Sequence, residues 1–86
     1  MTERPADGSR LTLLTRAGCH LCATAAETLA RIGAEAGLVA QEVDVDADPA
    51  LQAEYGDRVP VVLLDGAEHS YFTVDVLRLR RDLGLS

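Results

Sequence analysis

The segment RLTLLTRAGCHLCATAAETLARIGAEAG, residues 10–37, predicts a strand, a short loop and a helix in close succession. Arg10–Thr15 is a short run of leucine and threonine, which is typical of a strand. From Cys19 or His20 to about Ala36, apolar residues recur at steps of three or four, as on one face of a helix. Two cysteines therefore lie where the strand has ended and the helix begins.

The helix within this segment has an apolar stripe and a clear stop. Gly37 can adopt the left-handed backbone conformation that ends many helices. We expect the helix to bury one face, which carries the spaced apolar residues. These residues are Leu21, Ala25, Leu29, Ile32 and Ala36.

A second strand is predicted over Leu38–Val45, with Val39, Val43 and Val45 on one face. Alternate aspartates follow, and their spacing is similar to part of a calcium-binding loop. The glycine and the distal glutamate of such a loop are absent, so we interpret these aspartates as turn and capping residues. They are Asp44, Asp46 and Asp48.

The middle of the chain predicts a short helix and a β-hairpin. Asp48–Pro49 begins the helix, because aspartate caps helices and proline fits their first position, and Gly56 ends it. The continuous apolar run Val61–Leu64 indicates a strand that is buried on both faces. Asp65–Gly66 is a hairpin turn signal, and Glu68–Phe72 is the returning strand.

A final helix is predicted after Thr73, which can cap it, with Val76, Leu79 and Leu83 on its apolar stripe. The predicted order of elements is thus β-α-β-α-β-β-α. A helix joins the first two strands, so we expect these strands to be parallel. The sequence therefore predicts an α/β fold in which helices flank both faces of one mixed four-stranded sheet.

Length and composition allow a single domain over residues 10–86, preceded by a flexible polar tail at residues 1–9. The chain has 86 residues, of which 48% are hydrophobic, enough for a globular core. No apolar run approaches the roughly 18 residues of a membrane span. The first residues do not have the pattern of a secretory signal, so we expect a cytoplasmic protein that does not bind membranes.

The charge of the chain argues against nucleic acid as a partner. The formal net charge is −6, and all eight cationic residues are arginines. An acidic surface repels the phosphate groups of a nucleic acid. We also expect a monomer without a tightly bound cofactor.

Cys19 and Cys22 predict redox chemistry, because they lie at the start of a helix. Free N–H groups and the positive end of the helix favour an anion there, so the pKa of a cysteine thiol falls well below its usual value. Cys22 follows by almost one turn, so its sulfur can reach Cys19 and should be less exposed. We expect Cys19 to attack a substrate disulfide and Cys22 to resolve the mixed disulfide.

Two other interpretations of the cysteine pair remain open. A zinc site needs four ligands, and His20 and His69 could complete one, although His20 adjoins Cys19 and would strain a tetrahedron. An iron–sulfur cluster shared across a dimer is the related possibility. The third interpretation is a docking domain that keeps the fold without redox activity.

Each histidine also has a simpler interpretation. His20 either favours a thiolate as a nearby cation when protonated, or is a solvated residue at the helix start. His69 is interpreted as an ordinary strand residue, because nothing in the sequence pairs it with a partner.

Two motifs carry a family resemblance. Thr15–Cys22, followed by Gly56–Val61 with the sequence GDRVPV, resembles the glutaredoxin branch of the thioredoxin superfamily. The resemblance extends from about Leu11 to Leu83 and is greatest to small bacterial glutaredoxin-like proteins. It implies a thioredoxin-like fold and a thiol–disulfide oxidoreductase.

The resemblance also implies roles for individual residues. Cys19 and Cys22 match the nucleophilic and the resolving cysteine of the family. Pro60 matches its cis-proline, which leaves the backbone of Val59 free to pair with a bound peptide or glutathione. Arg16 matches a basic residue near a glutathione carboxylate.

Substrate recognition is less specific than the fold. Arg58, like Arg16, either binds an anionic substrate group or is a solvated loop residue. His20 is included among the candidate substrate-binding residues. The expected partner is a disulfide-containing protein or a glutathione mixed disulfide, with glutathione or a reductase as the source of electrons.

Two departures from the glutaredoxin pattern concern glutathione. The chain has Cys-His-Leu-Cys where glutaredoxins usually have Cys-Pro-Tyr-Cys. The glycine pair that precedes the last helix of glutaredoxins is replaced by Ser70–Thr73, which contains no glycine. Tyr71 brings a bulky side chain to that place, so glutathione binding of the usual kind is not assured by the motifs.

Overall fold

The computed structural model describes residues 10–85, so the tail predicted at residues 1–9 lies outside the described residues. Four strands and three α-helices follow one another in the order β1-α1-β2-α2-β3-β4-α3, with one 3₁₀ turn, η1, before α2. The strands are β1 (Leu11–Thr15), β2 (Gln41–Asp44), β3 (Val61–Leu64) and β4 (Ala67–Tyr71). The helical segments are α1 (His20–Ala36), η1 (Val45–Ala47), α2 (Pro49–Tyr55) and α3 (Val76–Asp82).

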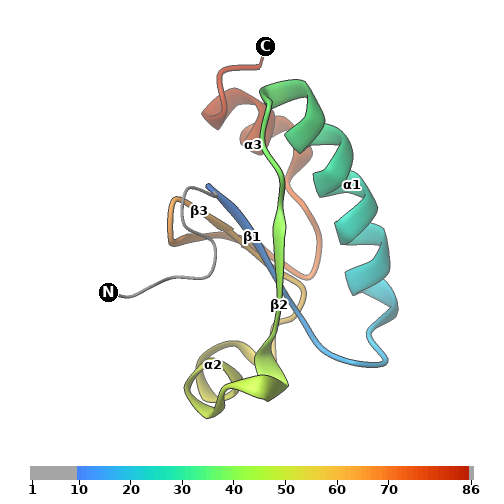
Figure 1. The fold of residues 1–86 in the computed structure, drawn as a ribbon, viewed down its shortest axis with the longest axis vertical. Coiled ribbons are helices and arrows are strands. Elements are labelled where there is room, and N and C mark those ends of the chain that lie inside the picture. The colour runs from blue at the N-terminus through green and yellow to red at the C-terminus, as the bar shows by residue number, and fades with distance from the viewer. Residues whose placement is uncertain (1–9, 86) are drawn as a thin grey trace.

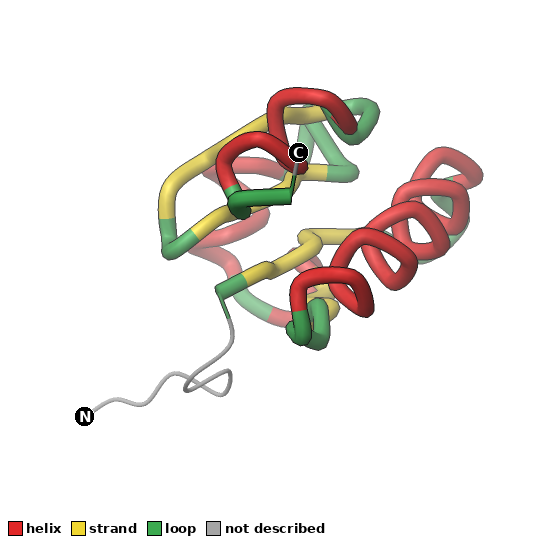
Figure 2. Tube along the Cα trace, turned by 90° about the horizontal axis from the view of Figure 1, so that it is seen from above, coloured by secondary structure: helices red, strands yellow, loops and turns green. Residues whose placement is uncertain are grey.

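The strands form one mixed sheet in the order β2-β1-β3-β4 (Figure 1). Strand β1 is parallel to β2 and antiparallel to β3, and β4 is antiparallel to β3. The long helix α1 forms a separate layer alongside the strands (Figure 2). The α/β fold predicted from the sequence, with its mixed four-stranded sheet, is therefore confirmed.

Helices cover both faces of the sheet. Side chains of a strand alternate between the two faces, so each strand contributes to a core on either side. On one face, Leu11 and Leu13 of β1 pack with side chains of α1 and α3. On the other face, Leu14 packs with Val45 of η1 and Leu51 of α2. The first of these cores is the larger, and it holds the long helix α1 in place.

Helix α1 buries most of the stripe predicted for it. Ala25, Leu29 and Ile32 are buried, whereas Leu21 is 52% exposed, contrary to the prediction. The reason is the helical period: Cys22 lies three residues before Ala25 and takes the inward position of the first turn. Leu21 consequently projects into solvent between the two cysteines.

The second strand is shorter than predicted, because the residues after Gly37 belong to the C-cap of α1. Gly37 has a positive φ of 75°, and the N–H of Leu38 donates to Gly33 O at 2.7 Å. The segment predicted as strand over 38–40 therefore completes the helix stop, and Val39 is 83% exposed. Val43 and Val45 do share the face that packs on α2.

The start of the last helix also differs from the prediction. The side chain of Asp75, not Thr73, caps α3 by accepting a hydrogen bond from the N–H of Arg78 at 3.2 Å. Val76 is 39% exposed and leaves the predicted stripe, whereas Leu79 is fully buried. The segment between β4 and α3 is therefore longer than the sequence suggests and carries exposed apolar side chains.

The topology brings several loops to one end of the sheet, which we call the cysteine end. It comprises the carboxyl ends of β1, β2 and β4 and the amino end of β3. The loop from β1 to α1 lies there. The described chain begins at the opposite end, and Leu83 and Leu85 near its end pack against the larger core, to which Leu11 belongs. Figure 1 shows the C-terminus beside the last turn of α1, away from α2.

Candidate active site

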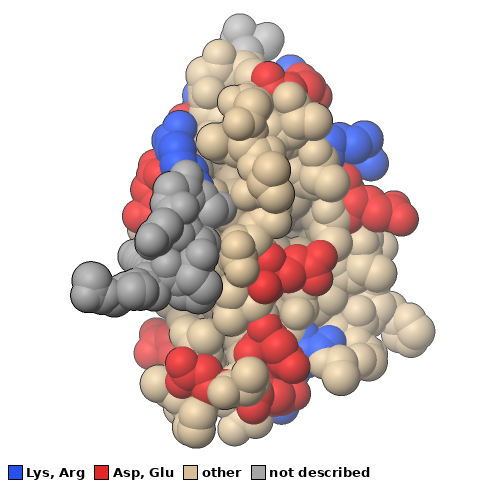
Figure 3. All heavy atoms as spheres, viewed as in Figure 1, with Lys and Arg blue, Asp and Glu red and all other residues tan. Residues whose placement is uncertain are grey.

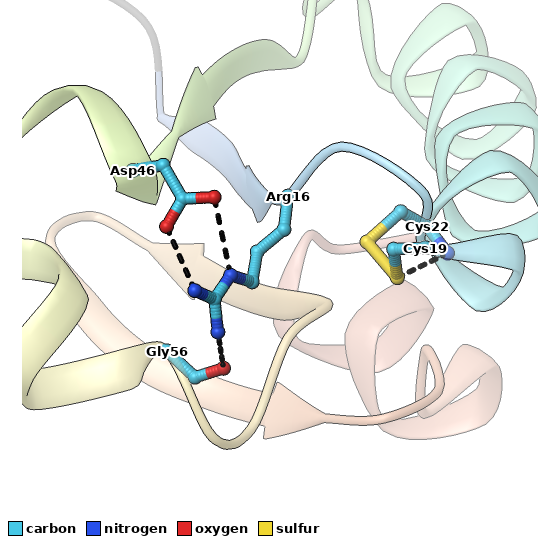
Figure 4. Close-up of a disulfide and its surroundings, with 5 residues drawn as sticks. All are labelled: Arg16, Cys19, Cys22, Asp46 and Gly56. Carbon is cyan, nitrogen blue, oxygen red and sulfur yellow. Dashed lines mark hydrogen bonds and ion pairs between the residues drawn. A yellow bond between two sulfur atoms is a disulfide. The ribbon is translucent and has the colours of Figure 1, made fainter.

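Cys19 and Cys22 form a disulfide at the start of α1 (Figure 4). Cys19 is the N-cap residue of the helix, and its Sγ accepts a hydrogen bond from the N–H of Cys22 at 3.1 Å. Cys22 is 5% exposed, whereas Cys19 is partly exposed. The two cysteines are thus unequal: Cys19 is the more exposed, and Cys22 lies behind it.

The surroundings of Cys19 favour a negative sulfur once the disulfide is reduced. Its Sγ lies at the amino end of a 17-residue helix, where backbone N–H groups have no partner within the helix. The first turn of α1 contains no acidic residue that would oppose a thiolate. His20 is exposed, as expected of a solvated residue at a helix start.

Val59 and Pro60 lie at the same end of the sheet as the cysteines. Val61 of β3 pairs with Leu14 near the carboxyl end of β1, so the residues before Val61 adjoin the loop that leads to Cys19. The Val59–Pro60 peptide bond is cis, as the resemblance implies. Pro60 is buried, and its carbonyl accepts a hydrogen bond from the N–H of Phe72 at 2.8 Å.

Arg16 connects three segments at the cysteine end (Figure 4). Its Nε and Nη2 donate to the two carboxylate oxygens of Asp46 at 3.2 and 2.9 Å. Its Nη1 donates to Gly56 O at 3.1 Å, and Gln52 Nε2 donates to Asp46 Oδ1 at 2.8 Å. The guanidinium thereby links the loop before Cys19 to η1 and to the end of α2.

The pairing of Arg16 with Asp46 shifts the pKa of each group in the direction that favours its charged form. The hydrogen bonds from Arg16 and then from Gln52 lower the pKa of Asp46 below its ordinary value. The hydrogen bond and the charge of Asp46 raise the pKa of Arg16. The role of Arg16 as a ligand for a substrate carboxylate stays a prediction, since a carboxylate of the chain already occupies its fork.

Arg58 is held in a similar way on the same side of the sheet. Its Nη2 donates to Glu68 Oε1 at 3.1 Å, and this hydrogen bond raises its pKa. The guanidinium also lies 5.5 Å from the ring centre of Tyr55 and 5.9 Å from that of Tyr71. Its predicted role in anion binding is likewise untested.

The segment that replaces the glycine pair of glutaredoxins is aromatic and exposed. The rings of Tyr71 and Phe72 meet edge to face with centres 5.0 Å apart, and both are about half exposed. Phe72 adopts a positive φ of 69°, a left-handed conformation that glycine adopts more readily. The Oγ atom of Ser70 is buried without a hydrogen-bond partner.

His69 lies in strand β4, as predicted, and it has partners that the sequence did not indicate. Its Nε2 lies 2.9 Å from Asp82 Oδ2, and Arg78 donates to its backbone carbonyl. The hydrogen bond to His69 lowers the pKa of Asp82. These residues tie β4 to α3, and their spacing of 9 to 13 residues carries no local signal.

Other features of the described residues bear on the alternatives. Over residues 10–85, no three histidine, cysteine or acidic side chains are grouped so as to hold a metal ion. No helix in this range is long and apolar enough to cross a membrane. Acidic side chains gather over α2 and the segment before it, close to the cysteine end (Figure 3).

The comparisons with known proteins agree with this geometry. The family model described as "Glutaredoxin-like domain (DUF836)" matches residues 10–84. An uncharacterized protein of Mycobacterium tuberculosis is 53% identical over 79 residues, which cover 86% of this chain and 81% of that protein. A relative from Mycobacterium bovis, also uncharacterized, matches to the same extent.

Solved structures extend the likeness to the whole fold. The X-ray structure of a structural genomics target protein from X. campestris has 40% sequence identity and a TM-score of 0.69. The match covers 88% of this chain and 97% of that one. A mutant thioredoxin from Halobacterium salinarum has 22% identity and a TM-score of 0.60, covering 88% of this chain and 74% of its own. This second likeness concerns the fold alone.

Proposed function

The chain belongs to the glutaredoxin-like domain family (DUF836), and from this premise we propose that it is a thiol–disulfide oxidoreductase. The observation that carries the proposal is the position of the Cys19–Cys22 disulfide at the start of α1, with the less exposed sulfur behind the more exposed one. A structural role for this disulfide is a poor alternative. It closes a loop between residues only three apart, so it constrains the unfolded chain very little.

The reaction consists of two exchange steps. The thiolate of Cys19 attacks one sulfur of a substrate disulfide, forms a mixed disulfide and releases the other sulfur as a thiolate, which takes a proton from water. Cys22, deprotonated, then attacks the Cys19 sulfur and releases the second substrate thiol. The protein dithiol is oxidised to the disulfide, and the substrate disulfide is reduced to two thiols by the same two electrons.

The protein needs an external reductant to act repeatedly. We propose that glutathione or a dedicated reductase returns two electrons to the Cys19–Cys22 disulfide. The residues of the site require no tightly bound cofactor for either exchange step, since sulfur itself carries the electrons.

The test uses the full chain, reduced and freed of reductant, with a small symmetrical disulfide such as 2-hydroxyethyl disulfide. Wild-type protein should release free thiol and become oxidised, whereas Cys19→Ser should lose activity by at least about 100-fold because it lacks the attacking thiolate. Cys22→Ser should instead stop as a mixed disulfide that mass spectrometry detects. Unchanged thiol release by Cys19→Ser would refute the mechanism.

A further inference from the structure

The surface beside the cysteines contains a hollow of about 190 Å³ whose lining residues are all uncharged. One wall is formed by the first two turns of α1, from Leu21 to Thr28, and the other by the segment from Phe72 to Val76. Leu21 lies within the disulfide loop itself, between Cys19 and Cys22. The hollow therefore begins where a substrate disulfide has to arrive.

Exposed apolar side chains gather around this hollow. Within residues 10–85, six large apolar side chains are exposed, and three of them line the hollow. The three are Leu21, Phe72 and Val76. An apolar surface of this kind is typical of a site that binds another molecule.

The groups at this end that could bind an anionic ligand are already paired within the chain. Asp46 occupies the fork of Arg16, and Glu68 occupies that of Arg58. The N–H of Phe72 donates to Pro60 O, so it is not free to hold a carboxylate. Glutathione carries two carboxylates, and these three groups would have to break existing interactions to bind them.

Building on the proposed function, we infer that the preferred substrate is a polypeptide disulfide with a large apolar residue next to its cysteine. That residue occupies the hollow between α1 and the Phe72–Val76 segment while Cys19 attacks the neighbouring sulfur. The volume suits such a group, because an apolar cavity of about 150 Å³ holds a benzene molecule. Only the side chain has to fit, since the peptide backbone remains over the exposed surface.

The experiment compares two blocked peptides, each with one cysteine in mixed disulfide with 2-nitro-5-thiobenzoate. They are identical except that the cysteine is flanked by leucines in one and by serines in the other. Reduced wild-type protein reacts with each in a single turnover, and each rate is divided by the rate with free dithiothreitol. We expect the normalised ratio of leucine to serine peptide to be about 5 to 10, from the apolar surface buried. The same mixed disulfide of glutathione should react no faster than the serine peptide.

Two variants locate the effect. Val76→Ser should reduce the ratio to about 2 or less, because it removes apolar surface from one wall. Leu77→Ser is the matched control: Leu77 is exposed on the same helix but does not line the hollow, so the ratio should stay as in wild type. If Val76→Ser fails to fold, Thr24→Phe, which fills the hollow from α1, takes its place with the same expected reduction.

Each outcome decides one point. A normalised ratio near 1 in wild type, or a fastest reaction with the glutathione disulfide, overturns the inferred substrate class but leaves the proposed function standing. A ratio that survives both Val76→Ser and Thr24→Phe overturns the assignment to the hollow. Failure to react with either peptide and with 2-hydroxyethyl disulfide refutes the proposed function itself.

Discussion

The two flanks of the Cys19–Cys22 disulfide differ in whether their side chains are paired within the protein or open to solvent. On the flank towards α2, charged side chains bind one another: Arg16 pairs with Asp46, and Arg58 pairs with Glu68. On the flank between α1 and α3, an uncharged hollow is open to solvent.

This difference teaches that a charged residue near the cysteine pair can be engaged by the rest of the fold. A paired guanidinium on the first flank acts on the structure, because it fixes the loops that hold the cysteines. The unpaired apolar side chains on the second flank gain stability only when something covers them. The two flanks should therefore respond differently to substitution.

The largest effect is expected from Arg16→Ala, which removes the link between the loop before Cys19 and the end of α2. We expect the rate to fall by about 10-fold for small, peptide and glutathione disulfides alike, because misplaced reacting groups lower every rate. Arg10→Ala is the matched control, since Arg10 donates two hydrogen bonds to the carboxylate of Asp65 at the opposite end of the sheet. A loss confined to the glutathione disulfide would show instead that Arg16 binds a substrate carboxylate, as the family resemblance implies.

A smaller effect is expected from Phe72→Gly on the apolar flank. The preference for leucine-flanked peptides should fall about 2- to 3-fold, because part of one wall is lost. The free energy of unfolding in urea should stay within about 1 kcal/mol of wild type. Glycine adopts the left-handed φ at lower cost than phenylalanine, and this gain offsets the loss of the ring's contacts. Phe72→Asn, which also tolerates this φ, should lose the same preference. A full preference in both variants would contradict the placement of the wall.

The smallest effect is expected on the pH dependence of stability, through Asp46 on the flank towards α2. Because the pKa of Asp46 is lowered in the folded state, its stabilising contribution is complete above the pKa of the unfolded chain. It is lost as the pH falls through the folded value, so stability should decline more steeply in wild type than in Asp46→Asn between about pH 5 and 2. Urea unfolding at several pH values measures this slope. In an Arg16→Ala background, Asp46→Asn should change this slope less, because only the hydrogen bond from Gln52 remains, and an undiminished change would assign the shift to another cause.

Local patterns in the sequence were sufficient for the fold. The strand that ends at Thr15, the helix that follows it and the hairpin at Asp65–Gly66 each have a signal within a few residues. The position of the two cysteines at a helix start follows from the same patterns. The cis bond before Pro60 did not follow from local chemistry, and only the resemblance to glutaredoxins implied it.

Contacts across the fold could not be predicted in this way. Asp44, Asp46 and Asp48 are equally acidic in the sequence, but the 3₁₀ turn η1 presents Asp46 to Arg16, 30 residues away. The other two aspartates cap backbone N–H groups, as predicted. Leu21 illustrates the same limit, because the apolar period alone does not decide whether it or Cys22 faces inward.

The position of the ends of the described chain, opposite the cysteine end of the sheet, has a practical consequence. The described chain enters and leaves at the end of the sheet opposite the cysteine end, as Figure 1 shows for the C-terminus beside the last turn of α1. A fluorescent reporter joined after α3 would therefore extend away from Cys19 and leave the hollow open. The domain can thus be attached to a surface or to a sensor through its C-terminal end, with Cys19 on the side away from the attachment point.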